Sequence, residues 1–323
     1  MVHVYRLTTK SLLLENYISF SAETKVYHLE EDIIRPGHLL FTDGRMLMSL
    51  NNTSPENALE YTFGDYTPLF RSYPTKGYYD PYLMTGFAQV PSSAKVILLD
   101  HRNECLLQFD REHIEIEHFA LECKNNEDAR VNLKREYRYM FCDSYPGDNH
   151  LNYPTSILID VKQPSRLFIT DTENCLLRAL DMDTKNMTTV SCTVERRFHM
   201  VQDPASGDLF TTCERGIGRY DYAKGLFQLF SGHFRNLYLP GFSLKFDMVT
   251  GLCLLNSDSL VVADFPDNKL HVLHLSKNTT TPLYVKELNG TAIPLTFSML
   301  YSNGTLYLGT DGGGIKALQG KNL

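Results

Sequence analysis

Short apolar runs separated by polar turns recur along the whole chain. The clearest copy reads Ser156–Asp160, then Leu167–Asp171, then Cys175–Asp181, with turns at 162–165 and 172–174. Apolar runs of this length, bounded by Asp, Asn, Ser and Pro, are typical of β-strands joined by tight turns. No helical period of comparable strength is present, so the pattern predicts an all-β chain built from repeats.

Six copies of the second run align: Met46–Leu50, Val96–Asp100, Leu167–Asp171, Leu209–Cys213, Leu260–Asp264 and Leu306–Thr310. The ends of successive runs lie 42 to 51 residues apart, except for one interval of 71. Propeller blades repeat at about 40–50 residues. The sequence therefore predicts a six-bladed β-propeller, with the extra length in an insertion at about 125–149. A β-sandwich or two small β domains would not explain six aligned copies.

The third strands match as well, and Asn103, Asn174 and Asn268 stand in the turn before them. Asn tolerates the left-handed backbone conformation of tight hairpins. The last copy ends near Gln319, too early for a fourth strand, whereas Val2–Leu7 and Leu12–Phe20 are spare strand-like segments at the start. We expect one of them to complete the last blade and close the ring, which removes exposed sheet edges. Residues 1–323 are interpreted as a single domain.

Three copies carry a family resemblance: Tyr153–Asp160, Arg166–Asn174 and Ser259–Asn268. They resemble NHL-type repeats, while the first, fourth and sixth copies are degenerate. Secreted relatives of this architecture include strictosidine-synthase-like and paraoxonase-like enzymes, the peptide-amidating lyase and the yellow/royal-jelly proteins. The resemblance implies the fold and does not select one of these activities.

Charge and hydropathy exclude two classes of partner. The net charge is −7, and no basic cluster is interleaved with aromatic residues, so a nucleic-acid partner is not expected. No apolar stretch is long enough for a membrane-spanning helix. The first six residues are no signal peptide, which leaves a cytosolic protein or a mature secreted chain behind an added Met.

Sequons and cysteines favour the secreted alternative. Six Asn-x-Ser/Thr triplets begin at Asn51, Asn52, Asn186, Asn278, Asn289 and Asn303. Each is a candidate N-glycosylation site, although Asn-Thr turns also occur without glycans. The seven Cys form no CxxC pair, which argues against a structural zinc site and favours two or three disulfides; seven buried thiols of a cytosolic protein are the alternative.

Candidate chemistry lies in the histidines at the mouth of the propeller tunnel. His38 and His199 are expected to begin the inner strands of blades one and four, and His150 and His233 to lie in loops entering blades three and five. Three converging imidazoles, His38, His150 and His199, would make an open zinc site, and the resemblance to the amidating lyase gives that idea some support. Acid–base use without metal and purely structural histidines are the alternatives. A calcium site would use Asp160 and Asp203 at the ends of first strands.

Aromatic loops suggest a second kind of function. The segment 61–82 is rich in Tyr and Pro, and the insertion contains Tyr137, Tyr139 and Tyr145. These loops could cover the tunnel mouth, form a contact surface, or simply pack on their own blades. Two hypotheses result: a secreted enzyme that acts on a small ester, amide, amine or oxidisable aromatic, or an extracellular protein that recognises a protein, glycan or small ligand through its Tyr-rich loops.

Overall fold

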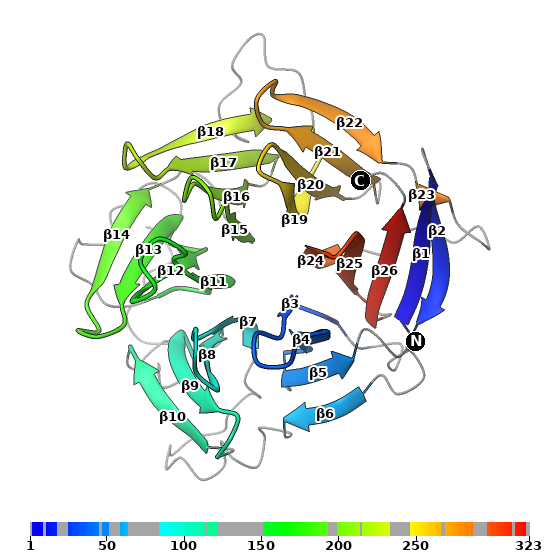
Figure 1. Cartoon of the computed structure of the whole chain (residues 1–323). Helices are drawn as coiled ribbons and strands as arrows, with labels where there is room; N and C mark the ends of the chain where they lie inside the picture. Colours follow the sequence, from blue (N-terminus) through cyan, green and yellow to red (C-terminus); the bar gives the residue numbers. More distant parts are fainter. Residues whose placement is uncertain are drawn as a thin grey trace.

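The structure is an all-β ring of six sheets. The computed structural model describes residues 2–8, 11–17, 25–44, 47–51, 59–63, 84–101, 103–113, 115–121, 151–192, 199–213, 215–232, 246–265, 269–283, 285–286, 296–311 and 314–320. Within these residues every helix-or-strand element is a strand, and each sheet forms one blade around a common axis (Figure 1). The predicted six-bladed propeller is confirmed.

Blades 1 to 5 are four-stranded antiparallel sheets in which strands adjacent in sequence pair with each other. Blade 1 contains β3 (His28–Glu31), β4 (His38–Thr42), β5 (Leu47–Asn51) and β6 (Leu59–Phe63). Blade 2 contains β7 (Met84–Gln89), β8 (Lys95–Asp100), β9 (Cys105–Asp110) and β10 (Glu115–Ala120). Blade 3 contains β11 (Ser156–Ile159), β12 (Arg166–Asp171), β13 (Leu176–Asp181) and β14 (Met187–Cys192). Blade 4 contains β15 (Met200–Gln202), β16 (Leu209–Cys213), β17 (Gly216–Asp221) and β18 (Leu226–Gly232). Blade 5 contains β19 (Val249–Asn256), β20 (Ser259–Asp264), β21 (Lys269–His274) and β22 (Thr279–Leu283).

Blade 6 joins the two ends of the chain. It contains β24 (Thr296–Ser302), β25 (Thr305–Thr310), β26 (Gly314–Gly320), β1 (Val2–Thr8), β2 (Ser11–Tyr17) and the short β23 (Val285–Lys286). β1 pairs with β26 in parallel, from His3 opposite Lys316 to Leu7 opposite Gly320, and β2 pairs antiparallel outside it. The expected closure by an N-terminal strand is therefore confirmed, and both N-terminal segments take part.

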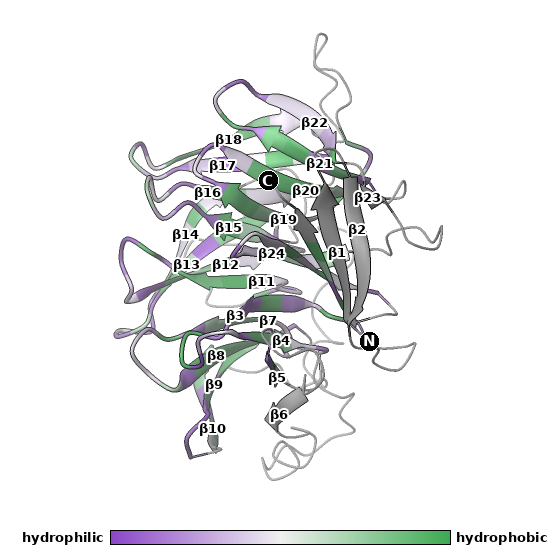
Figure 2. Cartoon of the chain, turned by 45° about the vertical axis from the view of Figure 1, so that its right-hand side comes forward, coloured by the Kyte–Doolittle hydropathy of each residue, from purple (hydrophilic) through white to green (hydrophobic). Residues whose placement is uncertain are grey.

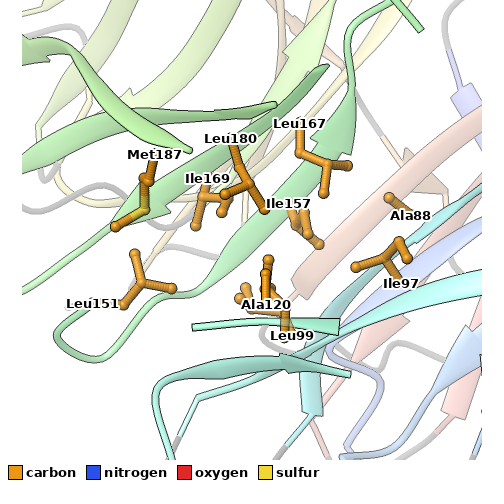
Figure 3. Close-up of a cluster of buried hydrophobic side chains, with 11 residues drawn as sticks. Ala88, Ile97, Leu99, Ala120, Leu151, Ile157, Leu167, Ile169, Leu180 and Met187 are labelled. Carbon is orange, nitrogen blue, oxygen red and sulfur yellow. The ribbon is translucent and has the colours of Figure 1, made fainter. Parts of the chain in front are cut away.

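The core lies between neighbouring blades rather than within one sheet. One cluster of buried side chains joins blades 2 and 3 (Figure 3): Ala88, Ile97, Leu99, Leu106, Ala120, Leu151, Ile157, Leu167, Ile169, Leu180 and Met187. The second strands are buried along nearly their whole length because another blade covers each face, which is why they read as continuous apolar runs. Polar residues concentrate in the turns (Figure 2).

In blade 1 the sequence alignment is wrong by one strand. Met46–Leu50 was expected to be its second strand, but that run is the third strand, β5, and the second strand is β4. The true first strand, β3, reads His-Leu-Glu-Glu and only Leu29 is fully buried within it. Because three of the four residues of β3 are polar, an apolarity pattern passes over it.

The turn before the third strand also differs from the prediction. The positive φ angles belong to Glu104 (58°) and Cys175 (55°), one position after Asn103 and Asn174. The Asn side chains instead donate to the carboxylate that ends the second strand: Asn103 Nδ2 to Asp100 Oδ2 (2.6 Å) and Asn174 Nδ2 to Asp171 Oδ2 (2.9 Å). Asn268 lies outside the described residues, as do most of the Tyr-rich segment 61–82 and the insertion 125–149.

Candidate functional site

The ring has two rims that need separate names. The first strand of each blade is its inner strand, and the six inner strands surround the centre of the ring (Figure 1). Because every blade repeats the same strand order around one axis, all inner strands run the same way along it. We call the side where they begin the start rim and the side where they end the end rim.

The four predicted histidines do not form one cluster in the described structure. His199 immediately precedes β15 and lies at the start rim. His38 begins β4, the second strand of its blade, and its C=O accepts the N–H of Asp32, which follows β3 (2.9 Å). His38 therefore lies at the end rim, on the other side of the ring from His199. His150 and His233 lie outside the described residues.

This placement does not fit the expected zinc site. A zinc ion bound by His38, His150 and His199 would need ligand distances of about 2 Å from opposite rims of the ring. Within the described residues, moreover, no group of three or more His, Cys, Asp or Glu side chains is arranged to hold a metal ion.

The expected calcium ligands also have other partners. Asp160 accepts Nε2 of Gln202 (2.9 Å) and the N–H of Lys162 (2.9 Å), and it pairs with Arg166. Asp203 accepts the hydroxyl of Ser206 (2.6 Å). Burial would raise the pKa of each carboxyl, but these hydrogen bonds outweigh it and lower the pKa. Both carboxylates hold turns at the end rim.

His199 shares the start rim with a histidine that the sequence analysis did not select, His28. His28 is the first residue of β3, so it stands at the start rim of blade 1. In a six-bladed ring, blades 1 and 4 lie opposite each other across the axis (Figure 1). Both histidines stand at the start rim, His28 in blade 1 and His199 in blade 4, and the charge of His28 contributes to lowering the pKa of His199.

The environment of His199 keeps its ring uncharged. Burial, and after it the nearby His28, lowers the pKa of His199 to about 3, although the residue keeps some exposed surface. Its backbone is fixed on both sides by Thr212: the N–H of His199 donates to Thr212 Oγ1 (2.9 Å), and its C=O accepts the N–H of Thr212 (2.9 Å). At physiological pH His199 therefore offers a neutral imidazole on a backbone that Thr212 holds in place.

His28 is positioned by a carboxylate and by an aromatic ring. Its Nε2 lies 3.1 Å from Glu30 Oε1, two residues along the same strand. Its ring packs edge-on against Phe87 of blade 2, with 4.6 Å between ring centroids and 78° between planes. Only 12% of the His28 side chain is exposed. A histidine held by a carboxylate in this way is a common arrangement for general acid–base catalysis.

Two buried hydroxyl groups near the start rim have unused hydrogen-bonding capacity. Ser156 begins β11 at the start rim and is 1% exposed, and Thr211 pairs in register with Met200 and is fully buried. Neither Ser156 Oγ nor Thr211 Oγ1 has a hydrogen-bond partner among the described residues. Buried polar atoms normally have partners, so these two oxygens mark positions where a water or a ligand group would be accommodated.

The cysteines limit the number of disulfides. Cys175, Cys213 and Cys253 are thiols, so four cysteines remain and three disulfides are excluded. Burial raises the pKa of the Cys253 thiol to about 12, which makes it an inert core residue.

Comparison with known proteins supports the fold and nothing finer. No family profile and no curated protein sequence matches the chain. Among solved structures, the chain resembles streptogramin B lyase (TM-score 0.58, 12% identity, 94% of this chain and 96% of that chain). It also resembles a chain of a nidogen/laminin complex (0.57, 15%, 84% of each chain). A third neighbour is the extracellular domain of BT4673 from B. thetaiotaomicron (0.54, 13%); the match covers 91% of this chain but 32% of that one. These likenesses agree with the NHL-like six-bladed propeller expected from the repeats.

Proposed function

We propose that this chain is an extracellular protein that binds a small organic molecule at the start rim and acts on it there by proton transfer. The observation that carries the proposal is the presence of two histidines at the same rim of opposite blades: His28 is oriented by a carboxylate, and His199 is kept neutral by burial. Ligand sites generally combine an enclosed position with a few convergent polar groups. A lyase among the structural neighbours is consistent with chemistry on a scaffold of this shape.

The two histidines have different roles in this proposal. An ionised carboxylate only accepts hydrogen bonds, so Glu30 fixes the hydrogen of His28 on Nε2 and leaves Nδ1 as the basic nitrogen. His28 Nδ1 takes a proton from the bound molecule, and Glu30 stabilises the resulting imidazolium. His199 remains neutral, so it orients the molecule through a hydrogen bond without competing for the proton. Suitable substrates carry an acidic C–H next to a carbon that bears a leaving group, such as the oxygen of an ester or lactone. When His28 takes the proton, the C–H electron pair forms a double bond and the leaving group departs with its bonding electrons.

Extracellular location is part of the proposal. Asn186 and Asn303 are exposed in hairpin turns between β13 and β14 and between β24 and β25. Asn278 stands in the turn equivalent to that of Asn186, but its Nδ2 donates to the C=O of Phe230 in blade 4 (2.9 Å). Asn51 ends β5 opposite His38. We therefore propose glycans at Asn186 and Asn303 rather than at Asn278 or Asn51; Asn52 and Asn289 lie outside the described residues.

The cysteines fit the same location. We propose that Cys105, which is buried in β9, forms a disulfide with one of the three cysteines whose side chains lie outside the described residues, Cys123, Cys142 or Cys192. Non-reducing peptide mapping of secreted protein identifies that partner.

The decisive test is a ligand screen with matched histidine variants. Thermal shift is measured with a panel of small esters, lactones, amides and amines, and hits are followed for turnover by NMR. We expect a hit whose stabilisation is lost in His28→Ala and in His199→Ala and is kept in His113→Ala. His113 is a suitable control because it is two-thirds exposed (67%) in a turn at the end rim. If both start-rim variants keep the stabilisation and the turnover of every hit, the proposed site is wrong.

Recognition of a protein is the second candidate, and one neighbour supports it. That neighbour is a chain of a nidogen/laminin complex, so a propeller of this shape is found in a protein–protein assembly. In this chain the Tyr-rich segments 61–82 and 125–149 would supply the contacts. An extracellular binding partner whose affinity falls when several of these tyrosines are replaced, with no effect of His28→Ala, would favour recognition over catalysis.

A further inference from the structure

Gln89 connects the histidine site to the neighbouring blade. It is the last residue of β7 in blade 2 and is 7% exposed. Its Nε2 donates to Glu30 Oε2 (2.9 Å) and to the C=O of Glu31 (2.6 Å), and its Oε1 accepts the N–H of Ile33 (3.1 Å). All three partners belong to blade 1. This set of partners also fixes the amide orientation, because an oxygen must face the N–H and a nitrogen must face the two oxygens.

Among the described residues, the Glu30 carboxylate has one polar partner on each oxygen. Oε1 faces His28 Nε2, and Oε2 accepts from Gln89. A continuous chain of hydrogen bonds therefore runs from Gln89 through Glu30 to His28. β7 holds the other side of the histidine as well, since Phe87 packs against the imidazole. The orientation of His28 is thus set by two residues of the adjacent blade in addition to its own strand.

A second glutamine at the equivalent position joins two blades but contacts no carboxylate that holds a histidine, so it serves as a comparison for Gln89. Gln202 ends β15 as Gln89 ends β7, and its Oε1 accepts the N–H of Val161 in the preceding blade (2.8 Å). Its Nε2 donates to Asp160 Oδ1 (2.9 Å) and to the C=O of Gly207 (2.9 Å). Both glutamines join their blade to the previous one. Gln89 differs because the carboxylate that it holds also contacts a histidine.

We propose that Gln89 is a positioning residue of the start-rim site: it fixes Glu30 and thereby holds His28 in the Nε2–H tautomer, with Nδ1 directed to the bound molecule. This role matters only if the proposed function is correct, but it can be tested in protein without any ligand. Which nitrogen of a histidine carries the hydrogen is set by the hydrogen bond that the ring makes to an outer partner. Removing the support of that partner should release the tautomer even in protein without ligand.

The experiment reads the tautomer of His28 directly. Protein labelled with 15N-histidine is examined by NMR at pH 7.5, in the wild type and in Gln89→Met, Gln202→Met and Glu30→Ala. The His28 signals are assigned by their loss in His28→Ala. We expect one Nε2–H signature in the wild type and in Gln202→Met. We expect that signature to be lost in Glu30→Ala and replaced by averaged signals of both tautomers in Gln89→Met.

A second variant at the same position keeps the test valid if Gln89→Met does not fold. Gln89→Glu keeps an acceptor for the N–H of Ile33 but removes both donations and places a second carboxylate beside Glu30. It should disturb His28 as Gln89→Met does while keeping more of the contact between blades. If the His28 signature is unchanged in either folded Gln89 variant, or changes equally in Gln202→Met, the positioning role is refuted. An intact tautomer effect with no ligand in the screen would instead reject the proposed function and keep the inference.

Discussion

Asp171 should make the stability of this propeller decrease as the pH rises. It ends β12 with no exposed surface, and burial raises the pKa of its carboxyl from the ordinary 3.8 to about 6. Hydrogen bonds from Asn174 Nδ2 (2.9 Å) and from the N–H of Asn152 (2.7 Å) oppose this rise, and so does the charge of Arg178. Glu104 adds to the rise. Burial prevails, so the folded protein favours the neutral carboxyl.

The sign and size of the effect follow from linkage. A group whose folded pKa is raised contributes stability that is fully present below its unfolded pKa and is lost as the pH rises through its folded pKa. For Asp171 the loss occurs between about pH 4 and pH 6. The difference between 3.8 and about 6 corresponds to about 3 kcal/mol of unfolding free energy. That is a substantial part of the roughly 5–15 kcal/mol that is typical of a folded domain.

Asp171→Asn removes the charge and keeps an acceptor for the Asn152 N–H. Unfolding free energies of both proteins are measured by urea denaturation from pH 4 to pH 7.5, and the wild-type value is subtracted from the variant value at each pH. Subtraction cancels the groups that the two proteins share. The difference should rise by about 3 kcal/mol across this range.

Asp181→Asn provides a control of opposite sign. The N–H and the hydroxyl of Thr184 lower the pKa of the Asp181 carboxyl, so its contribution is present at neutral pH and is lost only as the pH falls. Its difference curve should stay flat from pH 5 to pH 7. A flat curve for Asp171→Asn as well would show that the buried carboxyl does not hold its proton, and the reasoning about its environment would fail.

Three further predictions test closure, cysteine chemistry and modification. Deleting residues 1–17 removes β1 and β2, leaves the edge of β26 unpaired and should lower the thermal midpoint and cause aggregation, measured by circular dichroism and light scattering. The Cys253 thiol should react with a thiol reagent only in denaturant, measured by peptide mapping, because burial raises its pKa to about 12. When the chain is expressed through the secretory pathway, Asn186→Gln and Asn303→Gln should each reduce the glycan mass, and Asn278→Gln should not; retention of full mass in both of the first variants would contradict the assignment.

The sequence predicts a strand correctly where neighbouring blades cover both of its faces. The second strands β8, β12, β20 and β25 are buried along nearly their full length, so each appears as an apolar run that periodicity can find. The inner strand β3 carries the polar residues His28 and Glu30, which contact Phe87 and Gln89 of blade 2 and interrupt the apolar run. The alignment therefore lost one strand in blade 1 and placed His38 on an inner strand.

That misplacement explains which part of the candidate site was predicted. His199 was found because the short run after it could be aligned with other first strands. His28 and Glu30 were missed because the polar stretch around them does not look like a strand at all. Their position opposite His199 also depends on ring geometry: blades 1 and 4 face each other only once six blades have closed.

A signal for the missed residues nevertheless exists within the repeat. In blades 1 and 3 the inner strand ends in the same way, since Asp32 and Asp160 each donate an N–H to the C=O of the residue that begins the second strand. With those residues aligned, His28 and Glu30 stand where blade 3 has Ser156 and Leu158. The positions that hold neighbouring blades together are retained, including a glutamine at the end of the next inner strand in both cases. Blade 1 departs from blade 3 at three positions of the inner strand, where His28, Glu30 and Glu31 stand in place of Ser156, Leu158 and Ile159. The first two form the imidazole–carboxylate pair, so a polar stretch before a retained Asp is the signal that would have found this part of the site.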